Sequence, residues 1–257
     1  MKKLIALLLT LIMVMSFAAC GNTGATEPNN ESTDEATTGT EEATTGEDVA
    51  VMTYEEYMAA ATDAKVCVET YVQANQSWWY DDEAGHGKVT IYAQDADGAY
   101  FAYEVNCTEE DAAKLIPGTK IRITGDKAEW AGEIEIMNGT VEFVEGGEPY
   151  VAEAIDATEL LGTDALKDKM NQLVTFNGMT FKSLSYKDSE WDKDIYVTLT
   201  LGETDYEFCV ENYLTGPDTD LYKAVEALAE GDVVNVTGFL YWYEGPNTHI
   251  TAVEKAA

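Results

Sequence analysis

The sequence predicts an all-β protein with short helices, built as two tandem copies of one unit behind a disordered tether. Three observations predict it. Runs of alternating apolar and polar residues, typical of half-buried strands, recur through residues 51–257. The segment Leu115–Gly125 matches Leu228–Gly238, with Leu, Gly, Thr and Gly at constant offsets. Hydrophobic residues make up 46% of the 257 residues, which is enough for a packed core.

The chain begins with a segment typical of a secretory signal peptide. Two lysines follow Met1, an apolar run extends from Leu4 to Phe17, and small residues lead to Cys20. The run is too short for a comfortable membrane span. This order of residues resembles the lipobox of bacterial lipoproteins, which implies removal of residues 1–19 and acylation of Cys20, as with palmitate. The alternative is an ordinary secretory signal in which Cys20 is incidental.

Residues 20–50 are predicted to form an acidic tether. Residues 21–50 contain eight acidic residues and neither an aromatic residue nor a lysine or arginine. Such a segment buries too little apolar surface to offset its chain entropy. The lipobox resemblance implies a membrane partner through the lipid on Cys20, expected on the outer face of a Gram-positive cell membrane, with a periplasm as the alternative. We expect the tether to hold the folded part away from the lipid surface.

Each copy of the repeat is predicted to contain three strands, a short helix and two further strands. In the first copy the strands cover residues 65–73, 88–93, 99–105, 119–125 and 133–143, and the helix covers 108–115. In the second copy the strands cover 172–182, 195–200, 206–211, 232–238 and 248–253, and the helix covers 220–229. A capping box at Thr53 and Glu56 starts a helix to about Thr62, and residues 155–170 are expected to form a matching helical lead-in. A Gly/Pro cluster at 145–149 places the boundary between units 51–148 and 149–257.

This order of elements, with a Gly-x-x-Ile/Val-x-Ile/Val-Thr-Gly strand after the helix, resembles the OB-fold, a five-stranded Greek-key barrel. The resemblance implies a ligand on the outer face of the second and third strands, flanked by the loops after the first and fourth strands. Secreted lipoproteins of unknown function share this appearance, so the resemblance implies no activity. The alternative fold is another small β-barrel or sandwich.

Aromatic residues gather in these loops and on these strands, and they are the predicted ligand-binding residues. They are Trp78, Trp79, Tyr80, Tyr92 and Trp130 in the first unit and Tyr186, Trp191, Tyr196, Trp242 and Tyr243 in the second. Tyr92 and Tyr196 are expected to face outward from the second strands. Exposed rings offer flat faces on which sugar rings stack. The alternative is that the tryptophans plug the barrel mouths or pack one barrel on the other.

Two further groups of residues have weaker claims to chemistry. Asp188, Glu190, Asp192 and Asp194 alternate along one loop and could offer carboxylates to calcium, although they lack an EF-hand pattern, and the alternative is a solvated acidic surface. Cys67, Cys107 and Cys209 are expected to be buried free thiols, with a Cys67–Cys107 disulfide as the alternative. We predict no cofactor and no metal.

The charge and the motifs together favour a non-catalytic binding protein. The formal net charge is −33, from 48 acidic and 15 basic residues, which argues against a nucleic-acid partner because phosphates are met by cations. The expected ligand is an oligosaccharide, a small molecule or a protein. One alternative is a structural or protein-interaction module of the cell envelope. Another is a glycan-active enzyme using Glu133 and Glu135, which share one strand face.

Overall fold

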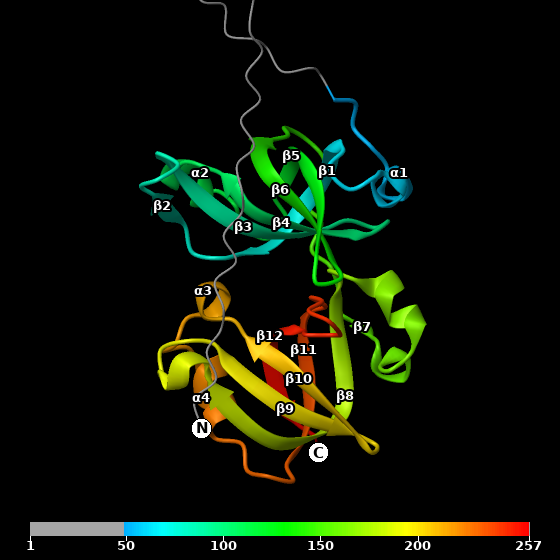
Figure 1. The fold of residues 1–257 in the computed structure, drawn as a ribbon, viewed down its shortest axis with the longest axis vertical. Coiled ribbons are helices and arrows are strands. Elements are labelled where there is room, and N and C mark those ends of the chain that lie inside the picture. Colours follow the sequence, from blue (N-terminus) through cyan, green and yellow to red (C-terminus); the bar gives the residue numbers. More distant parts are fainter. Residues whose placement is uncertain (1–48, 257) are drawn as a thin grey trace, which may run out of the picture. The chain divides into compact units, whose positions relative to one another are not determined.

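This computed structural model describes residues 49–256. These residues form two six-stranded sheets with short helices between the strands (Figure 1). These residues belong to one compact unit that spans Glu47–Ala257. The predicted signal peptide, the predicted lipidation site Cys20 and nearly all of the predicted tether lie outside the described residues. Among the helices of residues 49–256, none is long and apolar enough to cross a membrane.

The first sheet closes into a barrel. Its strands are β1 (Lys65–Asn75), β2 (Trp79–Asp81), β3 (His86–Gln94), β4 (Ala99–Asn106), β5 (Lys120–Trp130) and β6 (Glu133–Phe143). They pair in the order β1-β5-β6-β4-β3-β2, and β1 also pairs with β3, which closes a ring of five strands. The β4–β6 pair is parallel and the other pairs are antiparallel.

The second sheet repeats this closed order. Its strands are β7 (Ile155–Asp156), β8 (Leu173–Tyr186), β9 (Ile195–Leu201), β10 (Thr204–Val210), β11 (Val233–Phe239) and β12 (His249–Lys255). Strand β8 pairs with both β9 and β11, and β10 runs parallel to β12 as β4 does to β6. The predicted fold class is confirmed: the chain contains two tandem OB-like barrels with few short helices. The two short strands β2 and β7 were not predicted.

The helices are short and begin at side-chain caps. They are α1 (Tyr54–Ala59), α2 (Glu109–Ala112), α3 (Asn212–Thr215) and α4 (Asp220–Glu226). The capping box at Thr53 and Glu56 is present at α1. The helical lead-in expected over residues 155–170 is wrong. That segment contains β7 and two 3₁₀-helices, η1 (Thr158–Leu160) and η2 (Asp164–Lys169), because Gly162 between them adopts φ of 83° and ends η1. A third 3₁₀-helix, η3 (Lys187–Ser189), follows β8.

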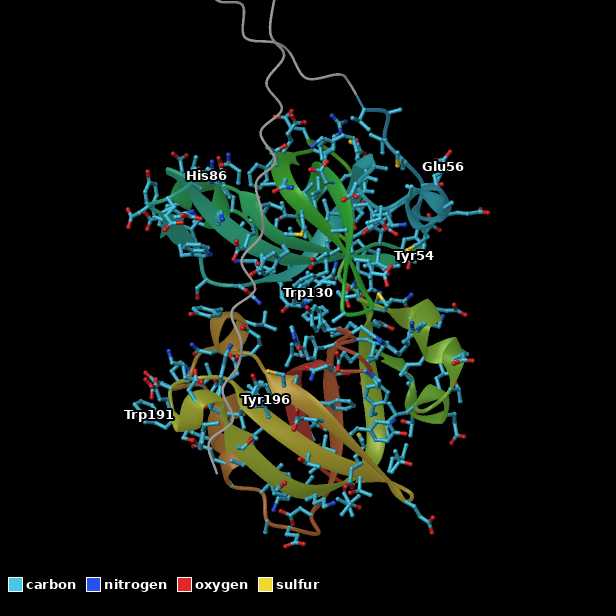
Figure 2. All side chains as sticks on the ribbon, viewed as in Figure 1. Tyr54, Glu56, His86, Trp130, Trp191 and Tyr196 are labelled. Atoms are coloured by element: carbon cyan, nitrogen blue, oxygen red, sulfur yellow. The ribbon has the colours of Figure 1, made fainter. Side chains whose placement is uncertain are left out.

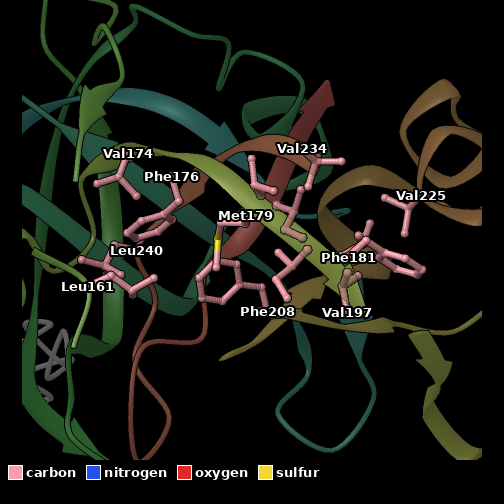
Figure 3. Packing of buried hydrophobic residues seen from close by; sticks show 14 of the residues in the cluster. Leu161, Val174, Phe176, Met179, Phe181, Val197, Phe208, Val225, Val234 and Leu240 are labelled. Carbon is pink, nitrogen blue, oxygen red and sulfur yellow. The ribbon is translucent and has the colours of Figure 1, made fainter. Parts of the chain in front are cut away.

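Each barrel has a core of its own. Alternate residues of β3 and β4 point inward in the first barrel, including Val89, Ile91 and Ala102. In the second barrel Phe176, Met179 and Phe208 are among the buried residues (Figure 3). Burying such side chains contributes about 1.5–3 kcal/mol each. The residues between these inward positions face out from each barrel, so strand alternation decides which side chains reach the outer faces.

The repeated glycines have structural roles. Gly118 and Gly231 adopt φ of 88° and 91° in the turn that leads from helix to strand. Gly125 lies at an irregularity between β5 and β6, and Gly238 lies at the corresponding irregularity between β11 and β12. At both positions the neighbouring strand is so close that a side chain would overlap it. The internal sequence repeat therefore records backbone requirements of the barrel.

Candidate functional site: a cavity between the two barrels

A cavity of about 810 Å³ is lined by residues of both barrels. Its volume falls within the range of small-molecule sites. Seven aromatic rings line it: Trp79, Phe101 and Tyr103 from the first barrel, and Tyr196, Tyr213, Tyr241 and Tyr243 from the second. Four of them, Trp79, Tyr103, Tyr213 and Tyr243, remain between 36% and 56% exposed. The cavity therefore presents ring faces that no other side chain covers completely.

Strand alternation places several of these side chains in the cavity. On β4, Tyr100 and Ala102 point into the core, so Phe101 and Tyr103 face outward. On β9 and β10, Val197 and Phe208 are core residues, and their neighbours Tyr196 and Cys209 line the cavity. In both barrels these are the strands that correspond to the second and third of an OB-fold, whose outer face is where OB-folds bind ligands. The outer faces of these strands in the two barrels thus meet at one cavity.

An aromatic cluster beside the cavity joins the barrels. Tyr92 of β3 stacks on Phe239 of β11 with ring centroids 4.7 Å apart, and Tyr241 stacks on His249 at 4.4 Å. The hydroxyl of Tyr92 lies 2.6 Å from Nδ1 of His249. Tyr92 is 1% exposed and does not line the cavity. It does point out of its own barrel, but the second barrel covers it.

Polar contacts at either side of this cluster also link the barrels. The backbone N–H of Trp242 donates to Oε2 of Glu133 at 2.8 Å. The backbone N–H of Ser77 donates to the carbonyl of Tyr213 at 2.7 Å. Hydrogen bonds of this kind add little net stability when satisfied, but they are expensive to break when buried. They therefore fix the walls of the cavity relative to each other.

Acidic side chains outnumber basic ones in the lining. Glu104, Asp194, Glu207 and Glu211 line the cavity, against the single lysine Lys187. Burial, with a smaller effect of nearby Asp194, raises the pKa of Glu211 to about 7. Burial also lowers the pKa of His249 to about 4, so that its imidazole is neutral at physiological pH.

The acid pair Glu133 and Glu135 lies in the joint between the barrels. Burial raises the pKa of Glu133 to about 8 and that of Glu135 to about 7. Glu133 accepts the N–H of Trp242, and its Oε1 has no hydrogen-bond partner. Neither residue lines the cavity. The pair is therefore not placed to act on a ligand there, as the glycan-active alternative would require.

The structure brings three of the ten predicted aromatic residues to the cavity, namely Trp79, Tyr196 and Tyr243. Trp130 and Trp191 are 60% and 62% exposed but do not line it, and Figure 2 shows Trp191 at the outer edge of its barrel. Tyr80 is exposed beside Trp78. These three exposed residues stand apart from the cavity.

The other predicted aromatic residues pack inward. Trp78 packs on the first core and donates its Nε1–H to the carbonyl of Cys107 at 2.9 Å. Tyr186 and Trp242 pack on the second core, and the hydroxyl of Tyr186 bonds Glu226 at 2.6 Å. The alternative in which the loop tryptophans pack on the barrels thus fits Trp78 and Trp242 better than the ligand-binding prediction does.

The acidic loop does not form a metal site. Among residues 49–256, no group of three or more His, Cys, Asp or Glu is placed to hold a metal ion. Asp194 instead bonds Lys187 at 3.0 Å and accepts the N–H of Asn212 at 2.9 Å, while Asp188, Glu190 and Asp192 lie elsewhere along the loop. Cys67, Cys107 and Cys209 are buried free thiols, as expected.

Sequence reasoning missed several lining residues. Phe101, Tyr103, Glu207 and Glu211 lie on or next to the third strand of each barrel. Their signal was present, because alternation puts them on the same outer face as the predicted ligand site. The prediction concentrated on loop tryptophans instead. Tyr213 on α3 had no such signal, since it reaches the cavity only through the docking of the barrels.

Comparison with known proteins bears on the fold. No protein-family model and no curated protein sequence matches the chain. Among solved structures, it is similar to a murine DNA-binding protein bound to double-stranded DNA, with 14% identity and a TM-score of 0.37, over 74% of this chain and 96% of that one. It is similar to the Ifi202 HINa domain in complex with a 20-bp duplex, with 13% identity and a TM-score of 0.36, over 75% and 100%. It is also similar to a replication protein A heterotrimer bound to single-stranded DNA, with 11% identity and a TM-score of 0.31, over 73% of this chain and 49% of that one.

These comparisons overturn the exclusion of nucleic acid. The three similar structures named above hold double-stranded or single-stranded DNA, against the expectation that nucleic acid is no partner. The exclusion treated the net charge of −33 as a property of the whole surface. A nucleic acid contacts one local patch, and a sum over all residues does not say where the 15 basic residues lie. Nucleic acid therefore belongs among the ligands to be tested.

Proposed function

We propose that the chain is a lipid-anchored extracytoplasmic binding protein whose ligand occupies the cavity between the two barrels. The supporting observation is that seven aromatic rings from two barrels surround one cavity of about 810 Å³. Aromatic faces with a few polar groups are typical of small-molecule and sugar sites. The basic, apolar and small residues ahead of Cys20 support the anchor.

The test is a titration of the purified protein with candidate ligands. Calorimetry and tryptophan fluorescence measure the binding. The panel contains cell-wall oligosaccharides, dietary oligosaccharides, and double- and single-stranded DNA at low salt. Trp79 lines the cavity, so a ligand bound there changes its emission. The Trp130→Phe and Trp191→Phe background removes two exposed reporters that do not line the cavity.

Two substitutions locate the binding site. Tyr213→Ala and Tyr243→Ala remove half-exposed rings from the cavity, and we expect each to weaken binding about 5–30-fold, which corresponds to about 1–2 kcal/mol for a lost stacking contact. Tyr80→Ala is the matched control, because this ring is 53% exposed and lies outside the cavity. If Tyr80→Ala weakens binding as much as the cavity variants, the ligand does not occupy the cavity. If DNA binds and both cavity variants abolish that binding, nucleic acid is assigned to this site.

The anchor has a test of its own. We expect the protein to fractionate with membranes through a high-salt wash, and Cys20→Ala to release it. Membrane association of Cys20→Ala after that wash would contradict the lipid anchor without affecting the cavity.

A further inference from the structure

The carboxylates of the cavity are unequally neutralised. Glu104 pairs with Lys88 at 3.1 Å, and Asp194 pairs with Lys187 at 3.0 Å. Within residues 49–256, no lysine, arginine or histidine nitrogen lies within 4.0 Å of a carboxylate oxygen of Glu207 or Glu211. The lining thus holds two carboxyl groups without a cationic partner.

Glu211 is the more strongly desolvated of the two. One of its oxygens, Oε2, accepts the N–H of Leu214 at 2.9 Å, and the side chain lies close to the charge of Asp194. Burial and the nearby charge of Asp194 raise the pKa of Glu211 to about 7, while the hydrogen bond from Leu214 acts in the opposite direction. A positive group beside Glu211 would favour its ionised form and would gain the attraction of a partly buried carboxylate.

The rings of the cavity suit the same kind of ligand. The face of an aromatic ring carries negative potential and attracts a cation placed over it. Tyr213, Tyr243 and Trp79 are 56%, 53% and 42% exposed in the lining. Trp79 already has the ammonium group of Lys88 at 5.2 Å from its ring centroid. Aromatic faces next to unpaired carboxylates are the arrangement that binds organic ammonium ions.

We propose that the cavity selects ligands that carry an organic ammonium group, held over the tyrosine rings with its charge facing Glu207 and Glu211. This inference rests on the proposed function, because it names the chemical class of the ligand in that cavity. The volume leaves room for an apolar or sugar-like body beyond the charged group.

The experiment compares matched cationic and neutral probes on the full chain, purified in detergent, by calorimetry at 150 mM NaCl. Choline is compared with its neutral carbon analogue 3,3-dimethyl-1-butanol, and benzylamine with benzyl alcohol. We expect each cation to bind at least 10-fold more tightly than its neutral analogue. Equal binding within both pairs, or binding by neither cation, would overturn the proposal.

Variants separate the cavity from the acidic surface, which attracts any cation. We expect Glu211→Gln and Glu207→Gln each to weaken the binding of the cations about 3–10-fold and to leave the affinity for neutral ligands unchanged. Glutamine at 211 can still accept the N–H of Leu214, so the fold is retained. Glu83→Gln, at an exposed acid outside the cavity, is the control and should have no effect. Cation binding that neither cavity variant weakens would be surface binding and would contradict the proposal.

The two proposals fail in different ways. If an oligosaccharide or DNA binds and is lost with Tyr213→Ala while the cations do not bind, the ammonium class is wrong and the binding function stands. If no member of either panel binds, both are wrong. If the cations bind and both Tyr213→Ala and Glu211→Gln abolish or weaken that binding, both proposals are supported.

Discussion

The Tyr92 hydroxyl of the first barrel and His249 Nδ1 of the second lie 2.6 Å apart in a buried position. Because burial keeps the imidazole neutral, Nδ1 is assigned as the acceptor and the tyrosine O–H as the donor. The hydroxyl oxygen also accepts Nε2–H of Gln76 at 3.3 Å. One hydroxyl thus satisfies two polar groups, on residues of both barrels, beside the proposed ligand cavity.

Removing this hydroxyl should destabilise the protein. Tyr92→Phe keeps the ring stacked on Phe239 but leaves Nδ1 of His249 without its donor. We expect the free energy of unfolding to fall by about 1–3 kcal/mol, the usual cost of an unsatisfied buried group. Denaturant unfolding at pH 7 measures it. The control is Tyr213→Phe, whose exposed hydroxyl makes no side-chain bond within residues 49–256, and no loss from Tyr92→Phe would contradict the role of the bond.

The neutral state of His249 predicts a dependence on acid. Its pKa is about 4 in the folded protein and 6.5 in the reference state, so the unfolded chain binds this proton first as pH falls. Stability from the neutral imidazole is present above pH 6.5 and is lost progressively toward pH 4. We expect the difference in stability between wild type and His249→Gln to shrink over that interval. An NMR titration of His249 with a midpoint near 6.5 would contradict the assignment.

The raised pKa of Glu133 predicts the opposite change of stability with pH from that of His249. Its pKa of about 8 lies above the reference value of 4.5, so the folded protein retains a proton that the unfolded chain loses. The contribution of Glu133 to stability is then full below pH 4.5 and falls as pH rises to 8. At about 1.4 kcal/mol per pH unit, the total loss is a few kcal/mol. Glu133→Gln keeps an acceptor for the N–H of Trp242 and removes this loss. We expect the variant to be more stable than wild type at pH 8 and nearly equal at pH 4.5.

The control for Glu133→Gln is Glu129→Gln, at an exposed position of the same hairpin. Unfolding curves at several pH values measure both variants. A parallel loss of stability in Glu133→Gln and wild type between pH 4.5 and pH 8 would show that Glu133 is not the responsible group.

Local sequence patterns predicted each barrel but not how the barrels meet. The repeat of Leu115–Gly125 at Leu228–Gly238 and the alternation along each strand were sufficient for the closed barrels, because both reflect contacts within one unit. Tyr92 illustrates the limit. Alternation placed it on the outer face, whereas its burial depends on Phe239 and His249, which lie more than a hundred positions away in the chain.

The site was only partly predictable for the same reason. Tyr196 and Tyr243 could be assigned to a ligand face or loop from the order of elements, and they do line the cavity. Trp78 and Trp242 have the same sequence signal but pack on the cores. A loop tryptophan that covers its own barrel and one that faces a ligand differ only in local backbone direction, which composition and spacing do not encode.

Lys127 supports α1 from within the first barrel. Its Nζ donates to the carbonyls of Tyr57, Met58 and Ala60 at 2.9, 2.7 and 2.8 Å, at the end of the helix. Lys127→Met removes this donor from all three carbonyls, of which that of Tyr57 keeps the N–H of Ala60 at 3.2 Å, and we expect a loss of about 2–3 kcal/mol. The control Lys65→Met removes only an exposed ion pair with Asp126, which should cost less than about 1 kcal/mol. Denaturant unfolding compares them, and equal losses would contradict this role.

Gly238 connects the sequence repeat to the cavity. A Cβ at this position would overlap the carbonyl oxygen of His249 on the neighbouring strand, and only a backbone shift could relieve it. We expect Gly238→Ala to lower the free energy of unfolding by about 2–3 kcal/mol or more, because overpacking against backbone is poorly accommodated. Gly245→Ala is the control, since no atom lies within 4 Å of the added Cβ and its backbone does not have a positive φ. Because His249 lines the cavity and the shift would displace it, Gly238→Ala should also weaken the binding of cavity ligands, while Gly245→Ala leaves it unchanged. Unaltered stability and binding in Gly238→Ala would mean that the repeated glycine is not required by this close approach.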